Sequence, residues 1–272
     1  MLTQAKGWGP DGKRAAISIT FDNMGEASEL ERGQPPVMGP SGKHSSLEIL
    51  PDLLRILDGS KITYFVEGLN CEMYPDVIRS VQAAGHEIGV HGWRHENWGT
   101  TDAARREDAL KRSVAAFRSL GVDVRGFRPP GGKVDAAELR KECLAVGLNF
   151  ASPLGDIGDD TKDAGFTSLP FAWQHVDAYM LHPGLGALRQ MFGDPEEPIS
   201  YDEWGGVVDE LIRKVKREGG HATLIFHPSM LVQSERAVEI FAQFVKTVRE
   251  DADIWAPTCS ELVGWLSENG HS

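Results

Sequence analysis

Chemically reactive side chains stand directly after four short apolar runs of this 272-residue sequence. The runs are AAISITF, EIGV, VRGF and ATLIF, and the residues that follow them are Asp22, His91, Arg128 and His227. A carboxylate and an imidazole can exchange protons with a substrate, and a guanidinium beside a carboxylate keeps it ionised and oriented. If the runs are parallel strands, their carboxyl ends meet on one face of the fold. The sequence therefore predicts one site built from distant segments.

The segment HGWRH places His91 and His95 four residues apart. Both imidazoles can bind one metal ion if the segment turns helically after the strand. A pair at this spacing also arises by chance in a chain with nine histidines, so two unrelated loop histidines are the alternative. The position of the pair at the end of an apolar run favours the metal site.

Apolar, β-rich runs alternate with helical patterns along most of the chain. The runs cover 15–21, 62–68, 87–90, 124–127, 149–152, 167–171, 222–226 and 253–256. The helical patterns cover 73–84, 103–120, 135–147, 206–218, 234–249 and 259–268. This alternation is typical of a parallel sheet. Seven or eight strands in one continuous chain favour an α/β fold of the (β/α) barrel type over an open doubly wound sheet.

Three long stretches show no regular pattern: 23–44, 153–166 and 182–205. Stretches of this length in a compact domain are usually functional lids or disordered segments. No shift in composition and no internal repeat marks a boundary, so we expect a single domain over 1–272. The substrate cannot be derived from the sequence, because its selection would depend on these stretches.

The composition excludes several classes of protein. Hydrophobic residues at 41% and charged residues at 25% are typical of a globular protein. The net charge of -12, with no basic cluster, argues against nucleic acid as a partner. No run approaches the roughly 18 apolar residues of a membrane span. The start MLTQAKGWGPDGKR lacks a signal-peptide pattern and the three cysteines form no framework, so a cytoplasmic location is expected. The oligomeric state stays open.

Five motifs in a fixed order carry a family resemblance. They are TFDN at 20–23, HGWRH at 91–95, RPPGG at 128–132, an Asp-bearing segment at 173–177 and LIFHP at 224–228. In this order they resemble the polysaccharide deacetylase family, also called the NodB-homology family or carbohydrate esterase family four. The resemblance covers about 15 to 260. The context GHEIGVHGWRHENW is more similar to the branch with the metal-free bacterial allantoinases and some cytoplasmic peptidoglycan deacetylases than to the secreted chitin deacetylases.

The resemblance implies a distorted (β/α) barrel that hydrolyses an N-acetyl or related amide with a metal-bound water. By matching motifs, Asp22 is the expected general base and Arg128 the residue that holds it. His227 is the expected general acid, and Asp177 is the carboxylate behind His227. The position after the base, Asn23, would complete a metal site with His91 and His95, and zinc is the expected ion.

The sequence departs from the family pattern at two places. Many members carry a second Asp after the base, whereas Asn23 offers a neutral carbonyl oxygen, which should weaken the binding of a divalent ion. Glu26 is an alternative third ligand, or else the first acid of a helix near 26–32. The segment WQHVDAY matches its motif poorly, and His175 is a rival to Asp177 as the partner of His227.

The leading hypothesis is a metal-dependent N-deacetylase of an N-acetylated sugar or a small acetamide. A metal-free cyclic-amide hydrolase of the allantoinase type and a noncatalytic carbohydrate-binding descendant of the fold are the alternatives. Three tryptophans beside the motifs either stack on a sugar ring or pack in the core: Trp93, Trp98 and Trp173.

Overall fold

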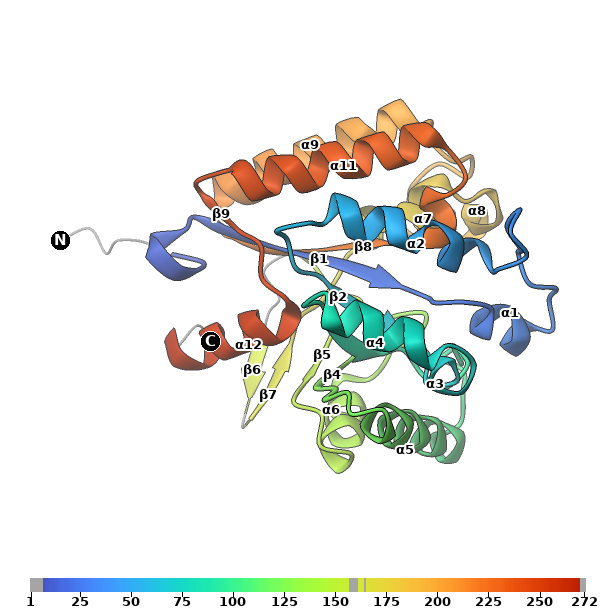
Figure 1. Ribbon diagram of the computed structural model, residues 1–272. Helices are drawn as coiled ribbons and strands as arrows, with labels where there is room; N and C mark the ends of the chain where they lie inside the picture. Colours follow the sequence, from blue (N-terminus) through green and yellow to red (C-terminus); the bar gives the residue numbers. More distant parts are fainter. Residues whose placement is uncertain (1–6, 157–160, 164, 270–272) are drawn as a thin grey trace.

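A computed structural model describes residues 7–156, 161–163 and 165–269 of the chain. The strands of this part form one sheet in the order β6-β7-β5-β4-β3-β2-β1-β8, and β9 pairs with β1 (Figure 1). Their bounds are β1 Ala15–Asp22, β2 Thr63–Val66, β3 Glu87–Val90, β4 Gly126–Phe127, β5 Phe150–Ala151, β6 Thr161–Asp163, β7 Phe166–Ser168, β8 Gly220–Phe226 and β9 Ile254–Trp255.

Seven parallel strands, β1 to β5 with β7 and β8, curl into a half-barrel. Only β6 runs antiparallel to its neighbour, β7, among the strands described. Beyond β5 and β8 the ring is continued by two single parallel bridges, Leu154 to Phe171 and Val176 to Ile225. The sheet therefore confirms the prediction of a distorted (β/α) barrel with about seven or eight parallel strands.

Helices cover the outside of the sheet (Figure 1). Three of those that follow the predicted patterns begin at side-chain caps: Asp102 caps α5, Asp135 caps α6, and Ser234 caps α11. α9 and α11 pack against each other along one flank, and α5 contacts α6 on another. The bounds of the longer helices are α2 Ser45–Ile56, α4 Pro75–Ala83, α5 Ala103–Ser119, α6 Ala136–Ala145, α9 Tyr201–Glu218, α11 Glu235–Glu250 and α12 Cys259–Asn269.

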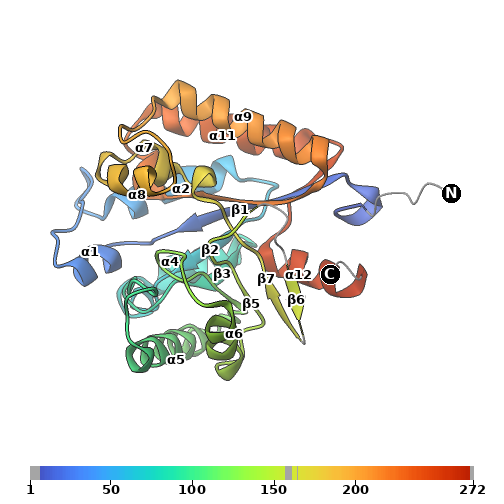
Figure 2. The same cartoon turned by 180° about the vertical axis from the view of Figure 1, so that it is seen from behind.

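Short helices gather at the end of the barrel to which β1 points (Figures 1 and 2). They are α1 Ala27–Arg32, α7 Asp177–Leu181, α8 Gly186–Met191 and α10 Pro228–Leu231. The other short elements are η1 Pro10–Gly12, α3 Asn70–Met73, η2 Trp173–His175 and η3 Pro183–Leu185. Because parallel strands share one direction, residues that follow β1, β2, β3, β4 and β8 meet at this end.

The structure corrects the assignment of the irregular stretches. The stretch 182–205 holds η3, α8 and the first turn of α9, because Ser200 and Glu203 form a capping box that starts α9 before Gly205 and Gly206. The stretch 23–44 holds α1. The stretch 153–166 contains β6, and its residues 157–160 and 164 lie outside the described part.

The sequence analysis assigned no element to 45–56, where the structure has α2. Its apolar face, which includes Leu47, Leu50 and Leu53, is buried in the core. Pro51 lies inside this helix and hides the periodicity, since proline usually breaks a helical pattern. In the part of the chain that the structure describes, no helix combines the length and the apolar character needed to cross a bilayer.

Candidate active site

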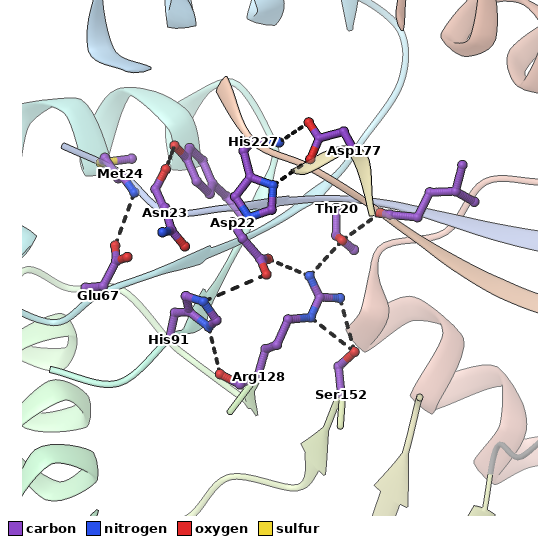
Figure 3. Close-up of polar contacts among 12 residues, drawn as sticks. Thr20, Asp22, Asn23, Met24, Glu67, His91, Arg128, Ser152, Asp177 and His227 are labelled. Carbon is purple, nitrogen blue, oxygen red and sulfur yellow. Dashed lines mark hydrogen bonds and ion pairs between the residues drawn. The ribbon is translucent and has the colours of Figure 1, made fainter. Parts of the chain in front are cut away.

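Asp22 and Arg128 form a buried ion pair at the carboxyl end of the sheet (Figure 3). Arg128 Nη1 donates to Asp22 Oδ1 at 2.5 Å and to Thr20 Oγ1 at 2.8 Å, while its Nη2 donates to Ser152 Oγ at 3.1 Å. The guanidinium carbon lies 4.1 Å from the centre of the Phe65 ring. One oxygen of Asp22 is thus held by Arg128, and the other, Oδ2, faces the site.

His91 lies beside this pair. Its Nδ1 is 2.8 Å from the carbonyl oxygen of Arg128, and because a carbonyl only accepts, Nδ1 carries the proton. Its Nε2 therefore keeps a free lone pair and lies 3.8 Å from Asp22 Oδ2. The His95 ring packs edge-on against His91, with 4.8 Å between ring centres.

The two histidines meet by a route that the sequence analysis did not expect. The segment after β3 does not turn helically. Instead Gly92 and His95 adopt left-handed φ angles of 77° and 74°, and the Glu96 carboxylate accepts hydrogen bonds from the main-chain N–H groups of Trp93 and Arg94. This tight turn, rather than one face of a helix, aims both rings into the site.

Both imidazoles of the pair are neutral at ordinary pH. Burial lowers the pKa of His91 to about 3 and lowers the pKa of His95 well below its usual value, and the charge of Arg32 lowers both further. The adjacent Asn23 has a left-handed φ of 62°, and its main-chain oxygen accepts a hydrogen bond from Tyr64 Oη at 2.8 Å. Its buried Oδ1 accepts no hydrogen bond from any residue that the structure describes.

These donors fit a divalent cation, although they carry no charge. Two neutral imidazoles are suitable ligands for zinc and similar ions, and the amide oxygen of Asn23 is a weaker, uncharged donor. Within residues 7–156, 161–163 and 165–269 no three His, Cys, Asp or Glu side chains are arranged to hold a metal, so the third donor would be Asn23. Glu26 points elsewhere, because its Oε2 accepts a hydrogen bond from Tyr74 Oη at 2.5 Å and it does not line the cavity.

His227 and Asp177 form the second ion pair of the site. Asp177 Oδ1 lies 2.6 Å from His227 Nδ1, and Asp177 Oδ2 accepts the main-chain N–H of His227 at 2.7 Å. The bridge between Val176 and Ile225 fixes this approach, because it joins the start of α7 to β8. Burial alone would lower the pKa of His227, but the Asp177 carboxylate outweighs it and the pKa is raised.

His175, the rival partner, lies apart from His227. Its pKa falls to about 4, first because it is buried and then because of the charge of Lys214, and it hydrogen bonds to the main chain of Thr223. His175 is the last residue of the 3-10 turn η2, whereas Asp177 is the first residue of α7, so the two side chains point in different directions. The structure places Asp177, and not His175, behind His227.

One cavity of about 880 Å³ brings the predicted residues together. Six of the seven leading candidates line its wall, and the seventh, Asp177, lies behind His227: Asp22, Asn23, His91, His95, Arg128 and His227. Side chains that follow different parallel strands therefore meet around one cavity, as the shared direction of the strands predicts.

The three tryptophans differ in their positions. Trp98 is fully buried against Phe127, with 4.6 Å between ring centres, and Trp93 is buried beneath the guanidinium of Arg112. Only Trp173, of these three, lines the cavity. Packing is therefore the role of Trp93 and Trp98, and stacking on a ligand is open only to Trp173.

The model of the family described as "Polysaccharide deacetylase" matches residues 9–151, just over half of the chain. The chain belongs to the polysaccharide deacetylase family. This membership confirms the family predicted from the motifs. The match includes Asp22, His91 and Arg128, whereas Asp177 and His227 lie beyond it and enter the site through the fold.

Relatives agree with the family. The peptidoglycan deacetylase-like protein FGM2 of Gibberella zeae is 33% identical over 88 residues, which are 30% of this chain and 26% of that protein. The chain thus matches about a quarter of the length of this curated relative. One similar solved structure is that of a Mycobacterium smegmatis protein provisionally designated a polysaccharide deacetylase. The match covers 100% of this chain and 97% of that chain, at 23% identity and a TM-score of 0.79. The match with the structure of Puue allantoinase covers 100% of this chain and 96% of that chain, at 15% identity and a TM-score of 0.77. At these identities the two structures show a shared fold.

The family motifs did not draw attention to Ser152 or Glu67. Ser152 follows β5 and binds the guanidinium of Arg128. Glu67 follows β2, in the run ITYFVEG, so the same strand-end rule that found Asp22 could have found both residues.

Glu67 is fully buried beside the strand end that carries Asp22. Its Oε2 accepts hydrogen bonds from Met24 N and from Asn70 Nδ2, each at 3.1 Å (Figure 3). Burial raises the pKa of Glu67 to about 8, with smaller contributions from the charges of Asp22 and Glu29. The surroundings of the site thus include a buried acid that resists ionisation.

Proposed function

We propose that this protein is a hydrolase of non-peptide carbon–nitrogen bonds that removes the acetyl group from an N-acetylated sugar or a small acetamide. The observation that carries the proposal is the pairing of charges around one cavity. Asp22 is held there by Arg128, and His227 is held there by Asp177. A fixed carboxylate and a fixed imidazole of raised pKa are the base and the acid that amide hydrolysis needs.

In the proposed reaction Asp22 Oδ2 takes a proton from a water molecule as the water oxygen bonds to the acyl carbon. Arg128 occupies Oδ1, so Oδ2 is the oxygen free to accept that proton. His227 Nε2 then gives a proton to the leaving nitrogen as the carbon–nitrogen bond breaks. Asp177 stabilises the doubly protonated ring through Nδ1 and keeps it turned toward the cavity.

Asn23, His91 and His95 would hold a divalent ion, with zinc as the expected one, in the metal-dependent form of this proposal. When bound, such an ion polarises the acyl oxygen and makes water more acidic. The neutral state of both histidines supports this role, because only a neutral imidazole offers a lone pair to a metal.

A sugar is the favoured substrate among the acetamides. The cavity of about 880 Å³ has room for more than a small amide, and Trp173 offers an aromatic surface to a sugar ring. Its wall also carries side chains suited to hydroxyl groups: Asn97, Thr100, Thr101, Ser229 and Gln233. The name of the Gibberella zeae relative, a peptidoglycan deacetylase-like protein, points the same way.

A metal-free cyclic-amide hydrolase is the second candidate. It is favoured by the uncharged donor set around Asn23 and by the likeness of the fold to Puue allantoinase. In that case His91 and His95 would form hydrogen bonds with the substrate. A noncatalytic carbohydrate-binding protein has less support, because Asp22 and His227 line the same cavity and can reach one substrate.

The test is a turnover panel of N-acetylated sugars, acetamides and cyclic ureides, run on protein purified without chelator and again after chelation. We expect release of acetate from an N-acetylated sugar, loss of activity on chelation, and recovery with Zn²⁺, Co²⁺ or Mn²⁺. Turnover of a cyclic ureide by metal-free protein would instead establish the second candidate. No turnover of any member, with sugar binding retained, would support the noncatalytic alternative.

A further inference from the structure

Arg32 is a cation of the cavity wall to which the chain gives no counter-ion. It is the last residue of α1, and its side chain lines the cavity. The other two arginines of the wall are paired. Arg105 binds Glu31, and Arg128 binds Asp22. Among the residues that the structure describes, no carboxylate lies within ion-pair distance of Arg32, so its guanidinium is available to a ligand.

The remaining acids of the wall are engaged by other groups of the chain. Glu29 Oε2 accepts a hydrogen bond from Ser28 Oγ at 2.9 Å, and Glu29 Oε1 lies 3.3 Å from His44 Nε2. Asp102 caps α5, where its Oδ1 accepts the main-chain N–H of Arg105 at 3.0 Å. Neither acid therefore neutralises Arg32.

His182 offers a second donor to the same cavity. It directly follows α7 and lines the wall. Its Nδ1 accepts the main-chain N–H of Gly184 at 3.0 Å, so the proton of the neutral ring is on Nε2. Burial lowers the pKa of His182, and the charge of Arg32 lowers it further, so the ring is neutral at ordinary pH. In the described part of the chain nothing accepts a hydrogen bond from this Nε2.

A buried arginine of α8 fixes the main chain at His182. Arg189 Nη1 donates to the carbonyl oxygens of Tyr179 at 2.6 Å and of His182 at 2.9 Å, and its Nε donates to that of Glu196 at 3.1 Å. A side chain at Gly184 would come within 2.9 Å of the His182 ring, so the glycine leaves room for the ring. The imidazole is thus held in place before any ligand binds.

Arg32 and His182 come from segments far apart in the sequence. Both α1 and α7 lie at the end of the barrel to which β1 points (Figures 1 and 2). The influence of the Arg32 charge on His182 shows that the two groups are near each other, since such effects fade over about 10 Å in 0.1 M salt. A guanidinium fork and an imidazole N–H beside it are donors only, and a carboxylate or phosphate is the ligand that matches them.

We propose that Arg32 and His182 bind a negatively charged group of the substrate, a carboxylate or a phosphate, and so select an N-acetylated sugar that carries such a group. The inference rests on the proposed function and adds a specificity to it. Because the acetyl group is neutral, the charge belongs to the sugar, which leaves as the amine. The charge of His227, the proposed proton donor to that amine, also acts on His182, in agreement with this orientation.

Three sugars that differ in one group test the proposal: N-acetylglucosamine, N-acetylmuramic acid, which adds a carboxylate, and N-acetylglucosamine 6-phosphate. Release of acetate by protein supplied with Zn²⁺ gives kcat/KM for each sugar. The readout is the ratio of kcat/KM for a charged sugar to that for the neutral one. We expect a ratio of at least about 10 for one of the two charged sugars, and the preferred sugar identifies the anion as carboxylate or phosphate.

Substitutions assign this preference to its residues. Arg32→Gln should lower the ratio about 10-fold, the usual effect of one lost hydrogen bond to a charged group, and Arg32→Lys should recover part of it because the charge returns. His182→Ala should lower the ratio about threefold, since a neutral donor is lost. Arg213→Gln is the matched control, because Arg213 is an exposed arginine of α9 that pairs with Glu210 outside the cavity.

Added NaCl should lower the ratio in the wild type and leave it constant in Arg32→Gln, because salt screens an exposed charge. Circular dichroism checks the fold of each variant. Equal kcat/KM values for the three sugars in the wild type, or the same ratio in Arg32→Gln as in the wild type, would overturn the inference and leave the proposed deacetylation standing. Release of acetate from none of the three would contradict the deacetylation of sugars itself, and the inference with it.

Discussion

The two sides of the candidate site differ in how their charges are balanced. On one side every charge has its partner, Asp22 with Arg128 and Asp177 with His227. On the other side stand the uncharged side chains of Asn23, His91 and His95. The first side consists of charges that the chain itself pairs, whereas the second offers uncharged donors to a ligand. The proposed acid–base chemistry therefore depends on two ion pairs, and the proposed metal affinity depends on three uncharged side chains.

The largest effect should come from substitutions in the two ion pairs of the site. Asp22→Asn and His227→Ala should each lower kcat/KM at least about 10²-fold, because each removes one proton-transfer group. Steady-state kinetics on the best substrate of the panel provides the measurement. Circular dichroism and a thermal melt must accompany it, since Asp22→Asn leaves Arg128 buried without its counter-charge. A folded His227→Ala enzyme with full activity would remove His227 from the mechanism.

A second effect tests the neutral side directly. His91→Ala and His95→Ala should each abolish the uptake of Zn²⁺, because either change leaves at most two donors. The metal content of the purified proteins, measured by plasma mass spectrometry, provides the readout. His182→Ala is the control, since His182 lines the same cavity but is separate from the proposed ligands, and it should keep its metal. Normal metal content in the His91 and His95 variants would place the ion elsewhere.

A smaller effect sharpens the comparison by making the neutral side charged. Asn23→Asp should tighten metal binding by about 10-fold, because a carboxylate replaces a neutral amide at the ligand position. Calorimetric titration with Co²⁺ measures the change. Glu26→Gln should leave the affinity unchanged, since Glu26 is hydrogen bonded to Tyr74. Weaker binding in Glu26→Gln would make Glu26 the third ligand after all.

The smallest effect concerns pH. His227 must be protonated to act as the acid, so activity should fall as pH rises through its pKa, which Asp177 raises. Asp177→Asn removes the carboxylate charge, lowers that pKa, and should move the upper limb of the kcat/KM profile down by about one pH unit. His175→Asn should leave this limb in place, because His175 does not contact the pair. A shift in His175→Asn alone would reverse the assignment.

The convergence of Asp22, His91, Arg128 and His227 could be predicted because it depends on local patterns. Each of the four follows an apolar run, and the shared direction of parallel strands brings their carboxyl ends together whatever the details of packing. The capped helices α5, α6 and α11 were predictable for the same reason, since a cap and a period of 3.6 residues are local features.

Other features were set only by contacts between distant segments. The choice of Asp177 over His175 depends on the bridge from Val176 to Ile225, and the burial of Trp98 depends on its packing against Phe127. The turn of Glu26 toward Tyr74 joins residues 48 positions apart.

Glu67 shows most clearly which features the sequence determines and which depend on the tertiary structure. Its position after a strand was readable, and so was the loss of charge at Asn23. Only the fold brings the two together, because the Glu67 carboxyl meets the Met24 N–H across 43 residues of chain. Residue types and strand ends are local properties of a sequence, whereas the pairing of charges depends on which buried surfaces meet, and long-range packing decides that.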